Sequence, residues 1–386
     1  MNPPVPFPLK PVTVPPDRHT AERLRAAARQ VVLAARTPVL LAARLVRRRV
    51  TPPAVTLVHR LLVIRTDRIG DMVLSTAALA DLRAHFRHAR ITVLAPEGPL
   101  QVLRGHPAVD ALVPLKDRRL PPDLMGKFDL AIDLTPDARL LGARLAAATG
   151  APWRTGLSAY GRQAFFTLPT AKARPDLHIV DLNRDLLRAI GVPSPAAEPT
   201  LHLQPSERAA AQARVSALGA AAPRVIVHPG AHYPSQRWAA GRFAEVIARL
   251  TETVGAACIV VAGPGEEDLA EAIGAATPDA LLPGPLDVRG LMGMIAVADL
   301  FLGNNSGPLH IAAALGVPTL SVMGPTDPRR FAPRRPEDTV LRLELPCSPC
   351  QRARCWHHTC LEAIPAEVVA ARARDILRAE PAEQAA

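Results

Sequence analysis

The chain has 386 residues, of which 48% are hydrophobic and 21% charged, so it is long enough for two domains and too apolar to be wholly disordered. Residues 1–57 carry ten basic and two acidic side chains and contribute +8 of the formal net charge of +11. The rest of the chain is close to neutral and aromatic residues make up only 3%, which excludes a dedicated nucleic-acid binder.

Residues 1–57 are predicted to form a basic arm outside the folded body. Residues 1–16 are rich in proline, and residues 20–49 interleave arginines with aliphatic side chains as amphipathic helices do. Such a helix binds an anionic membrane surface or packs on a protein core, and the sequence leaves both open. We expect no secretory leader, and the sequence has no run of about 18 apolar residues. We therefore expect a cytoplasmic protein, peripheral on the inner face of the cytoplasmic membrane if the arm binds that surface.

Residues 58–200 are predicted to form a first Rossmann-like domain, because short apolar runs alternate there with helical segments. Strands are expected at 61–65, 91–95, 111–115 and 130–134, and helices from residue 71 onward and at 100–104, 139–148 and 179–190. The proline-bearing stretch 191–205 is expected to be a linker.

Residues 201–386 repeat the pattern and predict a second Rossmann-like domain. The expected strands are 225–228, 258–262, 299–302 and 319–323, and the expected helices are 239–250, 267–275, 308–315 and 366–378. Two such α/β domains facing a cleft predict a GT-B architecture. Ligands would then bind at the carboxyl ends of the strands.

The loop from Arg65 to Asp71 joins the first expected strand to the first helix and contains two carboxylates and two guanidinium groups. Asp71 is expected at the helix start, where the helix macrodipole favours the ionised carboxylate and leaves it able to accept a proton. A purely structural role as the N-cap is the alternative.

The segment 302–310 predicts a helix start that binds anions. Ser306 suits an N-cap, Gly307 permits close approach of a ligand, and Pro308 fits the first helical turn. Backbone amides at such a position can hold a diphosphate, with the Ser306 hydroxyl beside it and His310 one turn further on. A well-capped helix with His310 as a core residue is the alternative.

Two other loops that follow strands carry groups suited to a nucleotide. Arg237 can neutralise phosphate charge, although Trp238 beside it would equally well pack beneath the loop. Glu266 stands in a glycine turn and offers a carboxylate to ribose hydroxyl groups, but turns of this kind are common.

Four of the five cysteines are close together near the C-terminus. Their spacing, C-x2-C-x4-C-x4-C, suits a structural zinc ion or an iron-sulfur cluster held by Cys347, Cys350, Cys355 and Cys360. Reduced structural thiols and a disulfide pair are the alternatives.

Together these loops resemble the signatures of glycosyltransferase family 9, the ADP-heptose:lipopolysaccharide heptosyltransferases. Residues 61–74 resemble the first signature, 227–238 the second, and 304–326, which end in Gly-Pro-Thr, the third. The resemblance spans about residues 60–375. It implies a GT-B enzyme that moves heptose from ADP-heptose to the lipopolysaccharide core, inverts the anomeric centre and needs no cofactor or metal for catalysis.

The resemblance also implies roles for residues. Asp71 becomes the general base that deprotonates the acceptor hydroxyl, and Arg65 a contact to an anionic acceptor. The donor diphosphate and sugar are expected to contact Ser306, Gly307 and His310, with Asn305, Arg237 and Glu266 in the same donor site.

Two positions depart from the resembled family, which often has Lys where this chain has Gln236 and Asp where it has Asn305. A catalytically inactive nucleotide-sugar-binding protein and a transferase for a different NDP-sugar are therefore alternatives. The acceptor is a lipopolysaccharide core or another cell-surface glycan.

Overall fold

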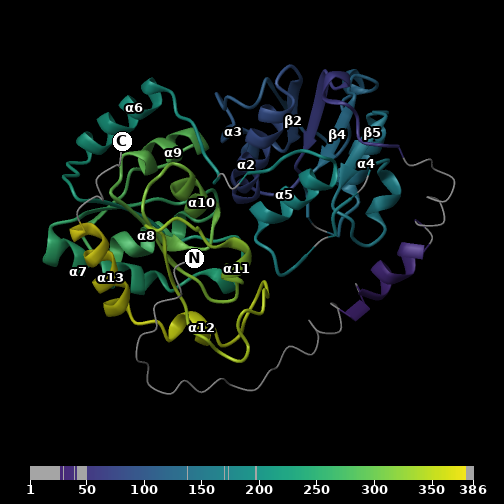
Figure 1. The fold of residues 1–386 in the computed structure, drawn as a ribbon. Helices are drawn as coiled ribbons and strands as arrows, with labels where there is room; N and C mark the ends of the chain where they lie inside the picture. Colours follow the sequence, from purple (N-terminus) through teal and green to yellow (C-terminus); the bar gives the residue numbers. More distant parts are fainter. Residues whose placement is uncertain are drawn as a thin grey trace. The chain divides into compact units, whose positions relative to one another are not determined.

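The structure, a computed structural model, describes residues 50–136, 138–168, 170–172, 174–195 and 198–379, together with 27, 28, 30–38 and 40. The chain divides after His202 into an N-terminal unit and a C-terminal unit. Each unit contains one parallel β-sheet flanked by helices (Figure 1). The expected alternation of strands and helices is thus confirmed in both halves of the chain.

The sheet of the N-terminal unit has five strands in the order β3-β2-β1-β4-β5. Its strands are β1 (Arg60–Ile64), β2 (Arg90–Ala95), β3 (Ala111–Pro114), β4 (Leu130–Asp133) and β5 (Trp153–Gly156). The longer helices are α2 (Ile69–His85), α4 (Leu141–Ala148) and α5 (Ile179–Ala189), and the shorter elements are α3 (Glu97–Gln101), η1 (Val55–Leu57), η2 (Pro122–Leu124) and η3 (Arg162–Phe165).

The register of this sheet brings the carboxyl ends of three strands to one edge. Ile64 at the end of β1 pairs with Leu94 of β2 and with Asp133 of β4. The β1 residues from Leu61 to Ile64 are at most 1% exposed, as the apolar run predicts for a strand covered on both faces. The loops that follow β1 and β4 therefore lie next to each other.

The sheet of the C-terminal unit has six strands in the order β11-β10-β9-β6-β7-β8. Its strands are β6 (Arg224–His228), β7 (Ala257–Val260), β8 (Ala280–Leu281), β9 (Leu300–Asn304), β10 (Thr319–Val322) and β11 (Thr339–Leu341). Its helical elements are α6 (Pro205–Ala217), η4 (Pro234–Gln236), α7 (Ala240–Val254), α8 (Glu267–Ala276), α9 (Val288–Ala296), α10 (Gly307–Ala314), α11 (Pro328–Phe331), α12 (Thr359–Glu362) and α13 (Ala366–Arg378).

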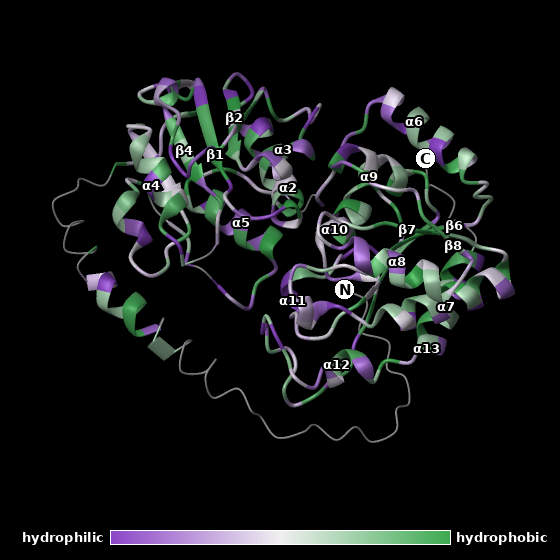
Figure 2. Ribbon diagram, turned by 180° about the vertical axis from the view of Figure 1, so that it is seen from behind, coloured by the Kyte–Doolittle hydropathy of each residue, from purple (hydrophilic) through white to green (hydrophobic). Residues whose placement is uncertain are grey.

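The core of the C-terminal unit follows the two-residue period of its strands. Val225 and Val227 of β6 face a cluster that includes Phe243 of α7 and Val369 of α13. Figure 2 shows β6 and β7 in the hydrophobic colour, whereas α6 mixes both colours. Because β6 pairs with β9 in a register that sets His228 opposite Gly303, the loops after these strands also meet at one edge.

Most of the predicted arm lies outside the described residues. Residues 30–38 are helical, and within them Leu33 is buried while Val31 and Val32 are exposed. Arg36 Nε donates to the Tyr160 carbonyl oxygen at 3.2 Å, so this part of the arm packs on the N-terminal unit. Over the described part of the chain, no helix combines the length and the apolar character that crossing a membrane requires.

Candidate active site

The N-terminal unit holds a buried arginine where β1 ends. Arg65 is 0% exposed, and its Nη1 donates to the Leu134 carbonyl oxygen at 2.6 Å. Its Nε donates to Asp67 Oδ1 at 2.7 Å, and its Nη2 lies 3.4 Å from Asp71 Oδ1. One guanidinium thus holds two carboxylates and ties them to the loop after β4. Its contacts are with the protein, and the predicted contact of Arg65 to an acceptor stays a prediction.

Asp71 is in the first turn of α2, which begins at Ile69 rather than at Asp71 as expected. The N-cap position is occupied by Arg68, so the alternative reading of Asp71 as an N-cap is wrong. The Asp71 side chain is 19% exposed. A carboxylate near a helix N-terminus, paired with a cation yet open to solvent, is suited to accept a proton from a bound hydroxyl.

Asp67 is a second carboxylate in this loop, which the sequence analysis did not single out. Burial raises the pKa of Asp67 to about 7, a shift that Arg65 opposes and the charge of Asp71 reinforces. The loop therefore changes its charge near neutral pH.

A buried ion pair supports the loop after β4. Arg162 of η3 binds the carboxylate of Asp133, and neither side chain is exposed. Arg162 Nη1 also donates to the Thr135 carbonyl oxygen at 2.6 Å, and a Cβ at Gly142 would overlap the Asp133 carboxylate. Neither charge was predicted, because Asp133 ends an apolar run and its partner is 29 residues away in sequence.

The C-terminal unit assembles a polar cluster from the ends of three elements. His228 ends β6, Glu266 precedes α8, and Ser306 is the N-cap of α10. His228 Nε2 lies 3.2 Å from Glu266 Oε2, and His228 Nδ1 lies 3.3 Å from Ser306 Oγ. His228 is 3% exposed and was not among the predicted site residues, although the second signature contains it.

Ser306 occupies the expected N-cap position, but its side chain makes no capping hydrogen bond and turns to His228 instead. The first residue of α10 is Gly307, followed by Pro308. His310 lies in the same turn and is 6% exposed. The first-turn amides of this eight-residue helix form the kind of N-terminus that binds anions.

Arg237 and Glu266 meet beside this helix start. Arg237 Nη2 lies 3.5 Å from Glu266 Oε1, and Arg237 Nε donates to the Ala231 carbonyl oxygen at 2.9 Å. Burial alone would raise the pKa of Glu266, but the bonds from His228 and from the Gly263 amide lower it below the usual range. Glu266 is therefore an ionised carboxylate that holds the loops together. Its predicted contact to ribose stays a prediction.

Trp238 packs beneath the loop, as its alternative interpretation expected, and is 2% exposed. Its backbone amide donates to Asn304 Oδ1 at 3.0 Å, and Asn304 Nδ2 donates to the Pro229 carbonyl oxygen at 2.8 Å. This buried amide side chain joins the second signature to the third. Arg237, next to Trp238, keeps 31% of its side chain exposed.

The two positions that depart from the resembled family lie side by side. Gln236 Nε2 donates to Thr326 Oγ1 at 2.8 Å, and Asn305 Nδ2 donates to the same oxygen at 3.2 Å. Asn305 Oδ1 is buried and accepts no hydrogen bond from the described residues. This acceptor is therefore unused within the described part of the structure.

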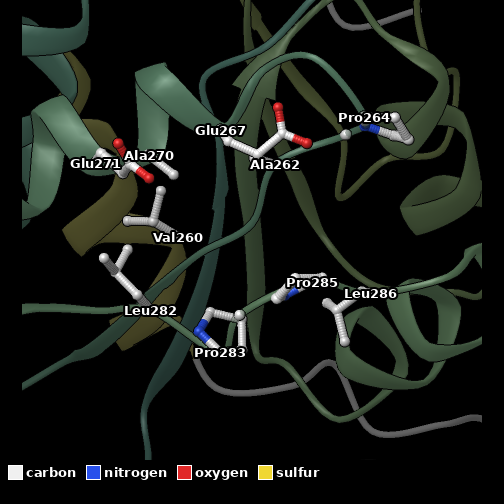
Figure 3. A pocket seen from close by; sticks show the side chains of 12 residues that line it. Val260, Ala262, Pro264, Glu267, Ala270, Glu271, Leu282, Pro283, Pro285 and Leu286 are labelled. Atoms are coloured by element: carbon white, nitrogen blue, oxygen red, sulfur yellow. The ribbon is translucent and has the colours of Figure 1, made fainter.

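A pocket of about 280 Å³ opens at the carboxyl end of β7 (Figure 3). Val260, Ala262 and Pro264 face the segment 282–286 across it, and Glu267 stands at its edge. Glu266 is not among the lining residues. A mostly apolar pocket with the carboxylates of Glu267 and Glu271 among its lining groups has the size and character of a site for part of a small ligand.

The cysteine segment, residues 347–360, is bonded to the signature loops of the same unit. Gln351 N donates to the Pro325 carbonyl oxygen at 2.8 Å, and Ser235 N donates to the Ala353 carbonyl oxygen at 3.4 Å. The segment is thus far from these loops in sequence but adjacent to them in space.

The thiols of this segment are free. Burial, reinforced by the three neighbouring thiols Cys350, Cys355 and Cys347, raises the pKa of Cys360 to about 12. The four thiols are thus near one another. In the described part of the chain, however, no three His, Cys, Asp or Glu side chains are arranged to hold a metal ion, so the thiols would have to move closer to bind one.

Comparison with known proteins matches residues 118–360 to the profile of glycosyltransferase family 9 (heptosyltransferase). The chain belongs to glycosyltransferase family 9. Lipopolysaccharide heptosyltransferase 3 of Escherichia coli is 28% identical over 282 residues, which are 67% of this chain and 81% of that relative. Lipopolysaccharide heptosyltransferase 1 of Pseudomonas aeruginosa is 25% identical over 324 residues, 77% of this chain and 88% of the relative.

The family 9 fold is confirmed by a solved structure. ADP-heptose lps heptosyltransferase II of Escherichia coli superimposes with a TM-score of 0.70 at 22% identity, covering 82% of this chain and 98% of that one. The predicted GT-B fold is therefore correct. The profile match includes the loops with Arg237, Glu266 and Ser306 and begins after the Arg65–Asp71 loop.

Proposed function

We propose that this family 9 protein is an inverting transferase that moves heptose from ADP-heptose to a lipopolysaccharide-core glycan. The observation that carries the proposal is the donor half of the site. A helix start at Ser306 of the kind that binds anions, a partly exposed guanidinium at Arg237 and a pocket beside Glu267 occur together at the strand ends of one unit. These are the features that a nucleoside diphosphate requires.

The donor is proposed to bind with its adenosine in the pocket and its diphosphate at α10. The apolar walls of the pocket accommodate a base, and the Glu267 carboxylate at the rim can accept hydrogen bonds from ribose hydroxyl groups. The amide of Gly307 and the Arg237 guanidinium neutralise phosphate charge. A shift of the Asn305 side chain that uncovers its Oδ1 would let that oxygen accept a hydroxyl of the sugar.

Asp71 is proposed to be the general base. It takes the proton of the acceptor hydroxyl as the acceptor oxygen bonds to the anomeric carbon, while the bond from that carbon to the diphosphate breaks and ADP takes the electron pair. Arg65 holds Asp71 in place, which makes it a positioning residue. The helix start and Arg237 stabilise the charge that develops on ADP, so we propose that catalysis needs no metal ion.

Two measurements test this function. The first is turnover with a panel of ADP- and UDP-sugars and a lipopolysaccharide-core acceptor, with and without a chelator. Transfer from ADP-heptose that survives the chelator is expected. ADP binding without turnover would instead support the inactive nucleotide-sugar-binding alternative, and turnover only with another sugar nucleotide would change the donor.

The second measurement is the transfer rate of Asp71→Asn. We expect a loss of about a hundredfold or more with ADP affinity unchanged, because a general base contributes on this scale to the chemical step and not to donor binding. Ser306→Ala and Arg237→Ala should instead weaken ADP binding. An Asp71→Asn enzyme with the wild-type rate would remove Asp71 from this role.

The arm is proposed to bind an anionic membrane surface near lipid-linked acceptors. Val31 and Val32 are 68% and 64% exposed on a helix whose Arg36 bonds to the N-terminal unit, so an apolar edge is open to solvent. Each basic residue near an anionic surface contributes on the order of 1 kcal/mol. Full-length protein should therefore pellet with anionic vesicles at low salt, and Val31→Ser with Val32→Ser should reduce the pelleted fraction. Equal pelleting would assign the arm another role.

A further inference from the structure

A hydrogen-bonded chain of three side chains ends at the helix start that we assign to the diphosphate. His228 lies in its middle, 3.2 Å from Glu266 on one side and 3.3 Å from Ser306 on the other. Gly230 is required next to it, because a Cβ there would overlap the Glu266 carboxylate. Three elements far apart in sequence thus place a carboxylate, an imidazole and a hydroxyl in line.

The chain has two hydrogen-bonding states, because the imidazole nitrogens change roles on protonation. In the neutral ring with hydrogen on Nε2, His228 donates to Glu266 and accepts the hydrogen of Ser306. That hydrogen is then not available to a ligand. In the imidazolium both nitrogens donate, so Ser306 accepts from His228 and its own hydrogen can be donated to a ligand oxygen. The protonated chain therefore suits an anion.

The charges around His228 also favour this coupling. The groups that face it are the ionised Glu266 and, on the other oxygen of that carboxylate, Arg237 at 3.5 Å. Glu266 offsets part of the charge of Arg237, so Arg237 neutralises only part of the negative charge that a bound diphosphate adds. A positive charge on His228 would offset this negative charge of the diphosphate. Because the His228 side chain is buried, salt would screen the attraction only weakly.

We propose that binding of the donor diphosphate draws one proton from solvent onto His228, so that Ser306 donates a charge-assisted hydrogen bond to the diphosphate. The inference rests on the proposed function, since it takes the diphosphate at α10 as given. When ADP leaves, the proton returns to solvent, so the cycle is balanced. Glu266 and His228 are positioning residues in this scheme, and Ser306 is the group that touches the ligand.

Calorimetry of ADP binding to the full chain tests the proposal. Titrations at about pH 7.5 in two buffers of different ionisation enthalpy give the number of protons taken up. ADP itself titrates near neutral pH, so the quantity of interest is the difference between wild type and His228→Gln, which can still donate to Glu266 but carries no charge. We expect a difference approaching one proton, and His88→Gln, at an exposed position of the N-terminal unit, should retain the wild-type uptake.

The pH dependence of the ADP Kd is the second readout. Coupling to one proton makes the wild-type Kd rise by up to about tenfold per pH unit above neutral, and the His228→Gln Kd should change less. ADP binding with equal proton uptake in both proteins would overturn the proposal and leave the function intact. No ADP binding by wild type would overturn the function itself. If His228→Gln does not fold, a pH-independent wild-type Kd overturns the proposal alone.

Discussion

Asp67 shares the buried guanidinium of Arg65 with Asp71, one carboxylate at Nε and the other at Nη2. Since burial raises the pKa of Asp67 to about 7, the charge beside the proposed base changes near neutral pH. Ionised Asp67 competes with Asp71 for the Arg65 guanidinium, which leaves the Asp71 carboxylate freer to accept the acceptor hydroxyl. We therefore expect kcat/KM to rise with pH through about 7 and Asp67→Asn to lose that rise. An unchanged profile in Asp67→Asn would separate Asp67 from catalysis.

The same group predicts a stability difference of defined sign. The folded pKa of Asp67 lies above its ordinary value of 3.8, so its ionisation is less favourable in the folded than in the unfolded chain. The free energy of unfolding therefore falls as pH rises from about 4 to about 7, because Asp67 ionises more readily in the unfolded chain over that range. Denaturant unfolding at about pH 5 and pH 8 should show a smaller fall for Asp67→Asn than for wild type. An equal fall would contradict the raised pKa.

The ion pair of Asp133 and Arg162 is expected to be important for stability. Both side chains are fully buried, so Arg162→Met leaves an uncompensated buried carboxylate and should lower the free energy of unfolding by about 3–5 kcal/mol. Arg174→Met is the matched control, since the Arg174–Asp176 pair is more than half exposed and its loss should leave stability unchanged. Equal effects in the two variants would argue against burial as the cause.

Gly230 provides a steric test of the donor site. The Cβ of Gly230→Ala would overlap the Glu266 carboxylate, so Glu266 must move away from His228 and Arg237. We expect weaker ADP binding. Gly241→Ala, in α7, meets nothing within 4 Å and should leave both ADP affinity and stability at or above the wild-type level, because alanine favours helices. ADP affinity retained by Gly230→Ala would show that the Glu266 position is not needed.

The cysteine spacing predicts about one zinc ion per chain, or an iron-sulfur cluster in protein prepared without oxygen. Cys350→Ser should then lower both metal content and the thermal stability of the C-terminal unit. Elemental analysis of both preparations measures the first, and thermal unfolding the second. If neither preparation contains stoichiometric metal, the metal site is wrong. The segment is then held by hydrogen bonds alone, such as the one from Gln351 N to the Pro325 carbonyl oxygen.

The fold was predictable because its strands are apolar runs and its helices begin after glycine-rich or polar loops. The β1 and β6 strands and the Ser306 helix start follow directly from such patterns. Other elements were missed for physical reasons. β5 reads Trp-Arg-Thr-Gly and has no apolar run, and β8 is two residues long. α6 was not expected because Pro205 was assigned to the linker, whereas proline is well tolerated in a first helical turn.

The candidate site was predictable at the level of loops but not of contacts. The positions of Asp71 and Ser306 at helix starts were visible in the sequence. The pairing of Arg162 with Asp133, and of His228 with both Glu266 and Ser306, depends on which strands are neighbours. Spacing along the sequence does not show which strands are neighbours in a sheet. These pairs could therefore be identified only from the structure.

The amide side chains of Gln236 and Asn305 make the geometry of their two loops insensitive to salt concentration. The resembled family often has a cation at the first position and an anion at the second, and this chain replaces both with neutral side chains that share the Thr326 hydroxyl. The exchange removes opposite charges together and leaves the local sum of charge unchanged. Hydrogen bonds between neutral groups are little affected by ionic strength. The geometry of this loop pair should therefore persist at salt concentrations that would loosen a lysine–aspartate bridge.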